Sequence, residues 1–116
     1  MQFMLLIWDD EDASGKAART PAYQAIVQQH HAFAAALDEA GIRKAGAGLS
    51  VATSARTVRN EGGTRTVHDG PFPETREQLA GYYLIEAADL DAAVEIARRA
   101  PSSPGGSIEV RAVMGG

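Results

Sequence analysis

The chain has 116 residues, of which 45% are hydrophobic and 22% are charged, and its net charge is -4. These values fit one globular domain over residues 1–116 and exclude a disordered tail or a rod as the main state. The eleven Lys and Arg residues are scattered, which excludes direct binding to nucleic acid or an anionic membrane. The absence of cysteine excludes disulfides, thiolate metal sites and a cysteine nucleophile.

The chain begins with a short apolar segment. Residues 3–8 form a continuous apolar run, as in a central strand that is buried on both faces. The segment carries no basic region, and about eight apolar residues are far fewer than the roughly twenty that a membrane span needs. We therefore predict a central strand, no membrane association and a cytoplasmic location.

A long amphipathic helix is predicted next. Residues 9–19 are mostly acidic and small, and they should form a loop. Thr20 is a typical N-cap residue, Pro21 suits the first helical position, and Gly41 suits the C-terminal end. Apolar residues recur at helical spacing between these ends, so one face of the helix should pack on a sheet.

The second half of the chain predicts more strands and a second helix. Small residues over 46–53 suggest a weak strand, and residues 56–59 and 64–68 predict a hairpin around a glycine-containing turn. Residues 74–80 could form about two helical turns, and residues 82–87 predict a central strand.

The chain should end with a helix and a strand. Asp89 is expected to cap a helix that Pro101 ends. Residues 108–113 alternate between apolar and mixed positions and predict an edge or interface strand.

This order of elements is the split βαβ pattern of ferredoxin-like folds. We predict an α+β, ferredoxin-like βαββαβ fold with an extra hairpin, in which two helices cover one face of an antiparallel sheet. The first strand would leave an apolar patch on the other face, which soluble proteins generally avoid. A second subunit is the simplest cover, so we predict a homodimer.

The stretch DGPFPETREQLAGYYLIE, residues 69–86, closely resembles the signature of the DGPF proteins, a branch of the YCII-related family. The resemblance extends to MQFMLLIW at the start, TSARTVR before the hairpin and SIEVRAVM at the end. It implies a dimeric α/β barrel whose two sheets face each other, with a cleft at the boundary of sheet and dimer. It also implies acid/base or lyase-type chemistry by a His and Asp pair, which has been suggested for relatives.

His68 and Asp69 are the candidate catalytic residues. An imidazole and a carboxylate together are sufficient for general acid/base catalysis near neutral pH. Neighbours in a strand point to opposite faces, so Asp69 would act with a group from elsewhere unless the strand ends before Gly70. The alternative interpretation is that Asp69 caps the turn, with its carboxylate accepting the backbone N–H groups of Gly70 and Phe72.

Four further residues are candidates for ligand binding. His30 lies on the apolar stripe of the predicted helix, where it either lines a cleft or packs in the core. Tyr82 and Tyr83 point to opposite faces of a strand, so one joins the core and the other faces the second subunit, where its phenol could bind a ligand. The family resemblance implies a basic residue at Arg76, which either binds an anionic group or faces solvent.

No metal or cofactor is predicted. The acidic run over residues 9–12 could hold Mg²⁺ or Ca²⁺ but lacks the spacing of a calcium loop, so it should be a solvated loop.

The sequence analysis leaves two candidate functions. The first is a homodimer of unassigned activity that binds a small molecule or performs acid/base chemistry of lyase or isomerase type. The second is a non-catalytic interaction module, since DGPF proteins resemble accessory partners in extracytoplasmic-function sigma factor signalling.

Overall fold

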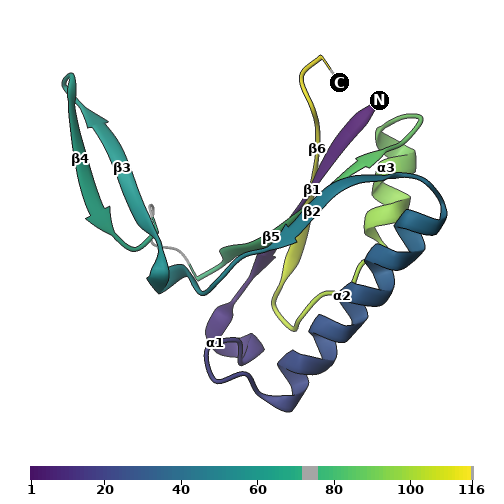
Figure 1. Cartoon of the computed structure of the whole chain (residues 1–116), viewed down its shortest axis with the longest axis horizontal. Helices are drawn as coiled ribbons and strands as arrows, with labels where there is room; N and C mark the ends of the chain where they lie inside the picture. Colours follow the sequence, from purple (N-terminus) through teal and green to yellow (C-terminus); the bar gives the residue numbers. More distant parts are fainter. Residues whose placement is uncertain (72–75, 116) are drawn as a thin grey trace.

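The computed structural model describes residues 1–71 and 76–115, and Figure 1 shows how its helices and strands are arranged. In chain order the elements are β1 (Gln2–Asp9), α1 (Glu11–Ser14), α2 (Pro21–Glu39), β2 (Arg43–Gly48), a short 3-10 helix (Ala52–Ser54), β3 (Arg56–Glu61), β4 (Thr64–Asp69), β5 (Gln78–Glu86), α3 (Leu90–Ala97) and β6 (Ser107–Ala112). Within these described residues, no helix is both long and apolar enough to cross a membrane.

Four strands of the described chain form one antiparallel sheet in the order β2-β5-β1-β6. β1 lies between β5 and β6, which confirms the predicted central strand, and β6 is an edge strand, as predicted. The chain passes through β1, α2, β2, β5, α3 and β6 in turn, which is the α+β, ferredoxin-like topology expected from the sequence.

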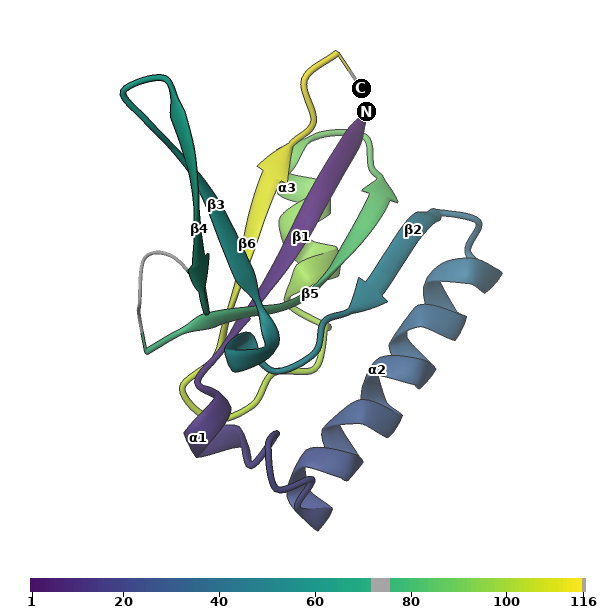
Figure 2. The same ribbon diagram turned by 60° about the vertical axis from the view of Figure 1, so that its left-hand side comes forward.

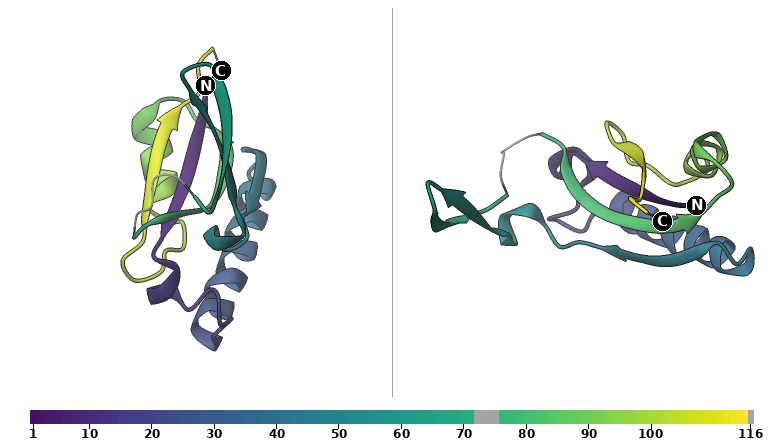
Figure 3. Two further views of the ribbon diagram at one scale, coloured as in Figure 1. Left: turned by 90° about the vertical axis from the view of Figure 1, so that its left-hand side faces the viewer. Right: turned by 90° about the horizontal axis from the view of Figure 1, so that it is seen from above.

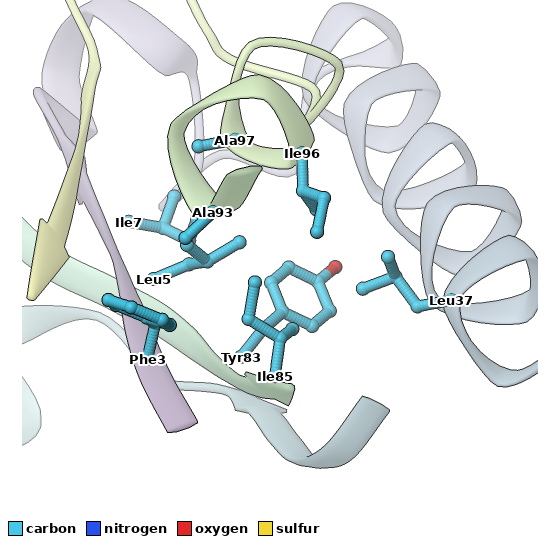
Figure 4. Packing of buried hydrophobic residues seen from close by; sticks show 9 residues of the cluster. All are labelled: Phe3, Leu5, Ile7, Leu37, Tyr83, Ile85, Ala93, Ile96 and Ala97. Carbon is cyan, nitrogen blue, oxygen red and sulfur yellow. The ribbon is translucent and has the colours of Figure 1, made fainter. Parts of the chain in front are cut away.

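The core lies on the face of the sheet that α2 and α3 cover. Alternate side chains of β1 are buried there, because neighbours in a strand point to opposite faces. Figure 4 shows side chains from β1, β5, α2 and α3 meeting in this core. Its buried members are Phe3, Leu5, Ile7, Leu37, Tyr83, Ile85, Ala93, Ile96 and Ala97.

The opposite face of the sheet, which we call the open face, is only partly buried. It carries Met4, Leu6 and Trp8 from β1 and Tyr82 and Leu84 from β5. The strand register places Leu6 beside Tyr82 and Met4 beside Leu84, so these side chains form one apolar strip. Within one chain β1 is therefore fully buried on one face alone, whereas its apolar run predicted burial on both.

Both long helices begin at the predicted caps. The Thr20 hydroxyl accepts the backbone N–H of Tyr23 at 3.2 Å at the start of α2. The Asp89 carboxylate accepts the backbone N–H of Ala92 at 2.8 Å at the start of α3. Each cap satisfies a donor that has no partner inside its helix, which is why these residues set the helix starts.

The predicted loop over residues 9–19 is wrong at its beginning. Asp9 is the last residue of β1, and α1 follows directly. Asp10 caps α1, since one oxygen of its carboxylate accepts the backbone N–H groups of Asp12 and Ala13, both at 3.1 Å. Part of the acidic run is therefore a helix cap, not a solvated loop.

The predicted hairpin is confirmed, and it extends away from the four-stranded sheet (Figures 1 and 3). Gly62 and Gly63 form its turn with φ values of 57° and 87°, which glycine adopts without a steric penalty. Val58 and Val67 pair across β3 and β4 and are 60% and 62% exposed. The hairpin thus presents an apolar pair to solvent in the single chain.

Two other predicted boundaries differ from the structure. The weak strand expected over residues 46–53 is β2 followed by the 3-10 helix, because β2 already pairs with β5 from its first residue. The helical turns expected over residues 74–80 are wrong from Gln78 onward, where β5 begins by pairing with the end of β1. Cross-strand pairing outweighs the helix propensity of so short a segment. Residues 72–75, which include part of the DGPFP turn, lie outside the described residues.

Gly81 lies where β5 pairs with β2, and an added Cβ would lie 2.7 Å from the backbone oxygen of Ala47. We expect Gly81→Ala to lower the free energy of unfolding by about 1 kcal/mol, because the edge strand β2 must shift to relieve this overlap. Urea denaturation measures the loss. Gly48→Ala is the matched control, since its Cβ would meet no atom of the described residues within 4 Å. Equal losses in the two variants would contradict the explanation.

Candidate functional site

A cavity of about 650 Å³ lies between α2, the strands β1, β2 and β5, and the segment that leads into α2. This volume is in the range of small-molecule sites. Tyr23, Ile26 and Val27 of α2 line the cavity, whereas Leu37 near the other end of the helix is buried against the sheet. Figure 2 shows α2 running alongside the sheet. The predicted packing of α2 therefore holds for its C-terminal half, and its N-terminal half forms a cavity wall.

His30 and Tyr83 form a hydrogen-bonded pair in the cavity wall. Nδ1 of His30 lies 2.8 Å from the Tyr83 hydroxyl, and this hydroxyl donates to the backbone carbonyl of His30 at 3.4 Å. The two rings stack with centroids 5.9 Å apart, and Phe33 packs edge-on against Tyr83. The pair therefore joins α2 to β5 and fixes the orientation of the imidazole.

Burial changes the proton affinity of both rings. It lowers the pKa of His30 from its ordinary value of 6.5, and the neighbouring His31 lowers it further. Burial raises the pKa of Tyr83 above 10.0, and the charge of Arg43 partly opposes this rise. His30 is thus a neutral imidazole near neutral pH, with Nε2 as the ring nitrogen that the hydrogen bond to Tyr83 does not use.

Asp9 brings a buried carboxylate to the same cavity. It is 7% exposed, and its Oδ1 has no hydrogen-bond partner among the described residues. Burial raises the pKa of this carboxyl above its ordinary value of 3.8, while the Ser14 hydroxyl and the charge of Lys16 oppose the rise. A buried acceptor without a donor is unfavourable unless a further group reaches it.

Lys16 and Arg19 add positive charge to the cavity lining. Lys16 is 7% exposed and makes no direct ion pair within the described part of the chain. Arg19 has φ 51°, a left-handed conformation that is uncommon for residues other than glycine. The segment between α1 and α2 therefore brings both residues to the cavity, Lys16 as a buried residue and Arg19 as an exposed one.

The structure brings together three of the predicted ligand-binding residues. His30, Tyr82 and Tyr83 all line the cavity. Tyr83 is the tyrosine that joins the helix-side core, and Tyr82 belongs to the open face. The His30 ring packs on Tyr83 and borders the cavity, and a ligand-binding role for it stays a prediction.

The predicted pair His68 and Asp69 lies elsewhere, at the end of β4 on the exposed hairpin. The Asp69 side chain is 93% exposed, with Oδ1 3.6 Å from Nε of Arg56, and Nε2 of His68 lies 3.5 Å from a carboxylate oxygen of Glu61. The N–H of Gly70 donates to the backbone carbonyl of Ala55 and not to the Asp69 carboxylate. Phe72, the other donor expected for Asp69, lies outside the described residues. A catalytic role for His68 and Asp69 stays a prediction.

Arg76 also lies away from the cavity. Its side chain is 94% exposed, and Nε lies 4.0 Å from a carboxylate oxygen of Asp10. It borders a shallow hollow with Trp8 and Glu109, which are themselves joined by a hydrogen bond of 3.2 Å. The predicted anion-binding role of Arg76 is untested, and its contact in the chain is with an acidic side chain.

Asp9 and Lys16 are the site residues that the sequence analysis missed. Asp9 continues the alternation of Phe3, Leu5 and Ile7, all of which face the core. That period of two was a usable signal, because it places a carboxylate on the buried face of a strand. No such pattern marks Lys16, which reaches the cavity only through the fold of the segment after α1.

The lowered pKa of His30 predicts a dependence of stability on pH. Because the folded protein holds this proton less tightly than the unfolded chain, the contribution of His30 is fully present above pH 6.5 and is lost as pH falls through the folded pKa. We expect the NMR titration midpoint of His30 below 6.5, and a rise of this midpoint in His31→Gln, which removes a repelling charge. A midpoint at or above the ordinary value would contradict the burial of the ring.

Two comparisons with known proteins show the family of this chain. The YCII-related domain matches residues 1–115. An uncharacterized protein of Rhizobium meliloti (strain 1021) is 36% identical over 115 residues, which cover 96% of this chain and 90% of that relative. The match extends over nearly the whole chain in both comparisons. This chain therefore belongs to the YCII-related family.

Proposed function

We propose that the chain acts in the cytoplasm as a homodimer of the DGPF branch that binds a small molecule and performs acid/base chemistry of lyase or isomerase type. The observation that carries this proposal is the buried carboxylate of Asp9. Its unpartnered Oδ1 belongs to a cavity that is also lined by the oriented imidazole of His30. Surrounding groups shift the proton affinities of both residues, as is common at functional sites.

The two groups have complementary proton-transfer roles. Burial raises the pKa of the Asp9 carboxyl and lowers the pKa of His30, so the proton affinities of the two groups are brought closer together, which suits proton transfer to and from a bound ligand. When the Tyr83 hydroxyl donates to the His30 carbonyl, Nδ1 carries the ring proton and donates it to the phenol oxygen. In this tautomer Nε2 is unprotonated and can accept a proton from a ligand.

The open face supports the proposed homodimer. Met4, Leu6, Tyr82 and Leu84 lie side by side across β1 and β5 and remain partly exposed in the single chain. A second copy of the same face would bury this strip, which suits the two facing sheets that the family resemblance implies. Tyr82 belongs to this strip, on the face of the sheet opposite α2 and α3.

The second candidate function is a non-catalytic accessory module of extracytoplasmic-function sigma factor signalling. The observation that favours it is the projecting hairpin, on which Val58 and Val67 expose an apolar pair. An isolated two-stranded hairpin is only marginally stable in water, and a protein partner would supply its missing contacts. In this function His68 and Asp69 would belong to a protein interface and not to a reaction.

An NMR screen of small organic fragments against the full chain separates these functions. We expect fragments to shift amide resonances around His30 and Gly81, and Asp9→Asn and His30→Gln to weaken this binding. His68→Gln is the matched control, because its imidazole lies on the exposed hairpin. If His68→Gln weakens fragment binding and the two cavity variants do not, the result would support His68 and Asp69 as the site. Failure of every fragment, with hairpin-dependent binding to a sigma factor, would support the accessory module.

A further inference from the structure

Lys16 is a buried cation without a direct counter-ion. Its side chain is 7% exposed and lines the cavity, and it makes no ion pair within the residues that the structure describes. The charge of Lys16 lowers the pKa of Asp9, but the two residues form no direct ion pair in the described chain. Lysine is rarely this buried along its length, and no hydrogen bond of its ammonium group is found within the described residues, so the ammonium group can bind an anion in the cavity.

Asp9 supplies the opposite requirement. Its Oδ1 is a buried acceptor with no donor in the described chain. Lys16 and Asp9 thus border the same cavity, one in need of an acceptor or negative charge and the other in need of a donor. A ligand that carries both kinds of group would satisfy both residues at once.

Arg19 places a second cation at the cavity. Its left-handed backbone is held by two hydrogen bonds: its N–H donates to the Lys16 carbonyl at 3.2 Å, and its carbonyl accepts from Nε2 of Gln24 at 2.7 Å. Such strain persists only where surrounding contacts maintain it, and it is frequent at functional sites. Lys16 and Arg19, at the two ends of this turn, both line the cavity.

The rest of the lining favours a compact ligand with an apolar body. Ile7, Ile26 and Val27 form an apolar part of the wall. Arg43 also borders the cavity, but its guanidinium already binds both carboxylate oxygens of Asp38, at 2.8 and 2.7 Å. Lys16 and Arg19 are therefore the cations available to a ligand.

We infer that the cavity binds a small organic acid that also carries a hydroxyl or amine, with its carboxylate on Lys16 and Arg19 and its donor on Oδ1 of Asp9. This inference rests on the proposed function, for which it names the class of ligand. The recognition needs an anionic group and a neutral donor on one apolar body. A neutral molecule of the same size would leave Lys16 without a partner.

Three matched probes test this recognition by calorimetry and by NMR on the full chain. Mandelate carries a phenyl ring, a hydroxyl and a carboxylate; phenylacetate lacks the hydroxyl; 1-phenylethane-1,2-diol replaces the carboxylate by a neutral alcohol. We expect mandelate to bind about ten-fold more tightly than the diol, because hydrogen bonds to charged groups contribute about 1.5 kcal/mol or more. Phenylacetate should fall between them, since it lacks only the donor to Asp9.

Lys16→Met should remove the preference for mandelate over the diol, and Lys16→Arg should retain most of it. Lys44→Met is the control, because Lys44, the other lysine of the chain, is exposed and does not line the cavity. Far-UV circular dichroism measures whether each variant is folded. If Lys16→Met does not fold, the comparison of Lys16→Arg with the wild type still tests the preference for mandelate.

The outcomes separate this inference from the proposed function. If the diol binds the cavity as tightly as mandelate, the inference about an organic acid is overturned and small-molecule binding stands. If Lys44→Met lowers mandelate affinity as much as Lys16→Met, the assigned cation is wrong. If none of the three probes shifts cavity resonances while other fragments do, the inference about an organic acid is overturned and small-molecule binding stands.

Discussion

Replacing Leu6 with lysine is expected to weaken the proposed homodimer by about 10²-fold or more, so that the chain becomes a monomer at micromolar concentration. Leu6 lies in the middle of the apolar strip on the open face, beside Tyr82 of β5 and Glu109 of β6. A symmetric interface would bring two added ammonium groups into an apolar contact, one from each copy, and removing them from water is unfavourable. Sedimentation equilibrium of the wild type and the variant measures the change in dissociation constant.

The control for this experiment is Leu90→Lys. Leu90 is equally apolar and 52% exposed, but it lies on α3, which packs on the other face of the sheet. The lysine in Leu6→Lys can face Glu109 within its own chain, so the monomer itself should stay folded. Dimers of unchanged affinity in Leu6→Lys, or a monomeric wild-type protein, would contradict an interface on the open face.

Replacing Asp9 with asparagine is expected to raise the free energy of unfolding by about 1–2 kcal/mol at neutral pH, because the charged carboxylate has a buried oxygen without a donor. The sign follows from the raised pKa of Asp9. Its contribution to stability is fully present below the ordinary pKa of 3.8 and is lost as pH rises through the folded pKa. Asparagine does not ionise, so the gain should appear on going from acid to neutral pH, as measured by chemical denaturation at both.

The matched control is Glu95→Gln. Glu95 lies on the surface of α3 in an exposed ion pair with Arg98, at 3.9 Å. Such pairs contribute little, so this change should alter the free energy of unfolding by less than about 0.5 kcal/mol at either pH. A loss of stability in Asp9→Asn at neutral pH would show that the carboxylate is a structural group. A gain would fit a site at which stability is sacrificed for activity.

The elements that follow from local chemistry were predictable from the sequence. Thr20 and Asp89 start helices because their side chains satisfy backbone donors only a few residues ahead. Gly62 and Gly63 form the hairpin turn because they adopt positive φ values freely. These interactions involve neighbours in the chain, so no distant contact is needed to specify them.

The errors lie where a distant segment decides the local structure. The start of β5 at Gln78 depends on pairing with the end of β1, about seventy residues earlier, and the short helix expected there has too few turns to compete. In the same way, β2 begins at Arg43, before the predicted start at residue 46, because its first residues pair with β5. Propensity within a window of a few residues does not contain this information.

The candidate site shows the same division. His30 and Tyr83 were expected near a ligand from their residue types and faces, but only the fold brings them within 2.8 Å of each other. Asp69 attracted attention because it lies in a signature motif, yet the hairpin holds it in solvent. Lys16 attracted none, because a lysine in a polar segment is normally exposed.

Sequence patterns alone predicted the α+β class, the central position of β1, the two capped helices and the hairpin, because these features depend on side-chain periodicity or on contacts within a turn. Membership of the YCII-related family was predicted from the resemblance of residues 69–86 to the family signature. Only the tertiary structure decided that Asp9, Lys16 and His30 border one cavity. That arrangement depends on how far α2 stands from the sheet and how the segment before it folds back, which are consequences of packing between distant parts of the chain.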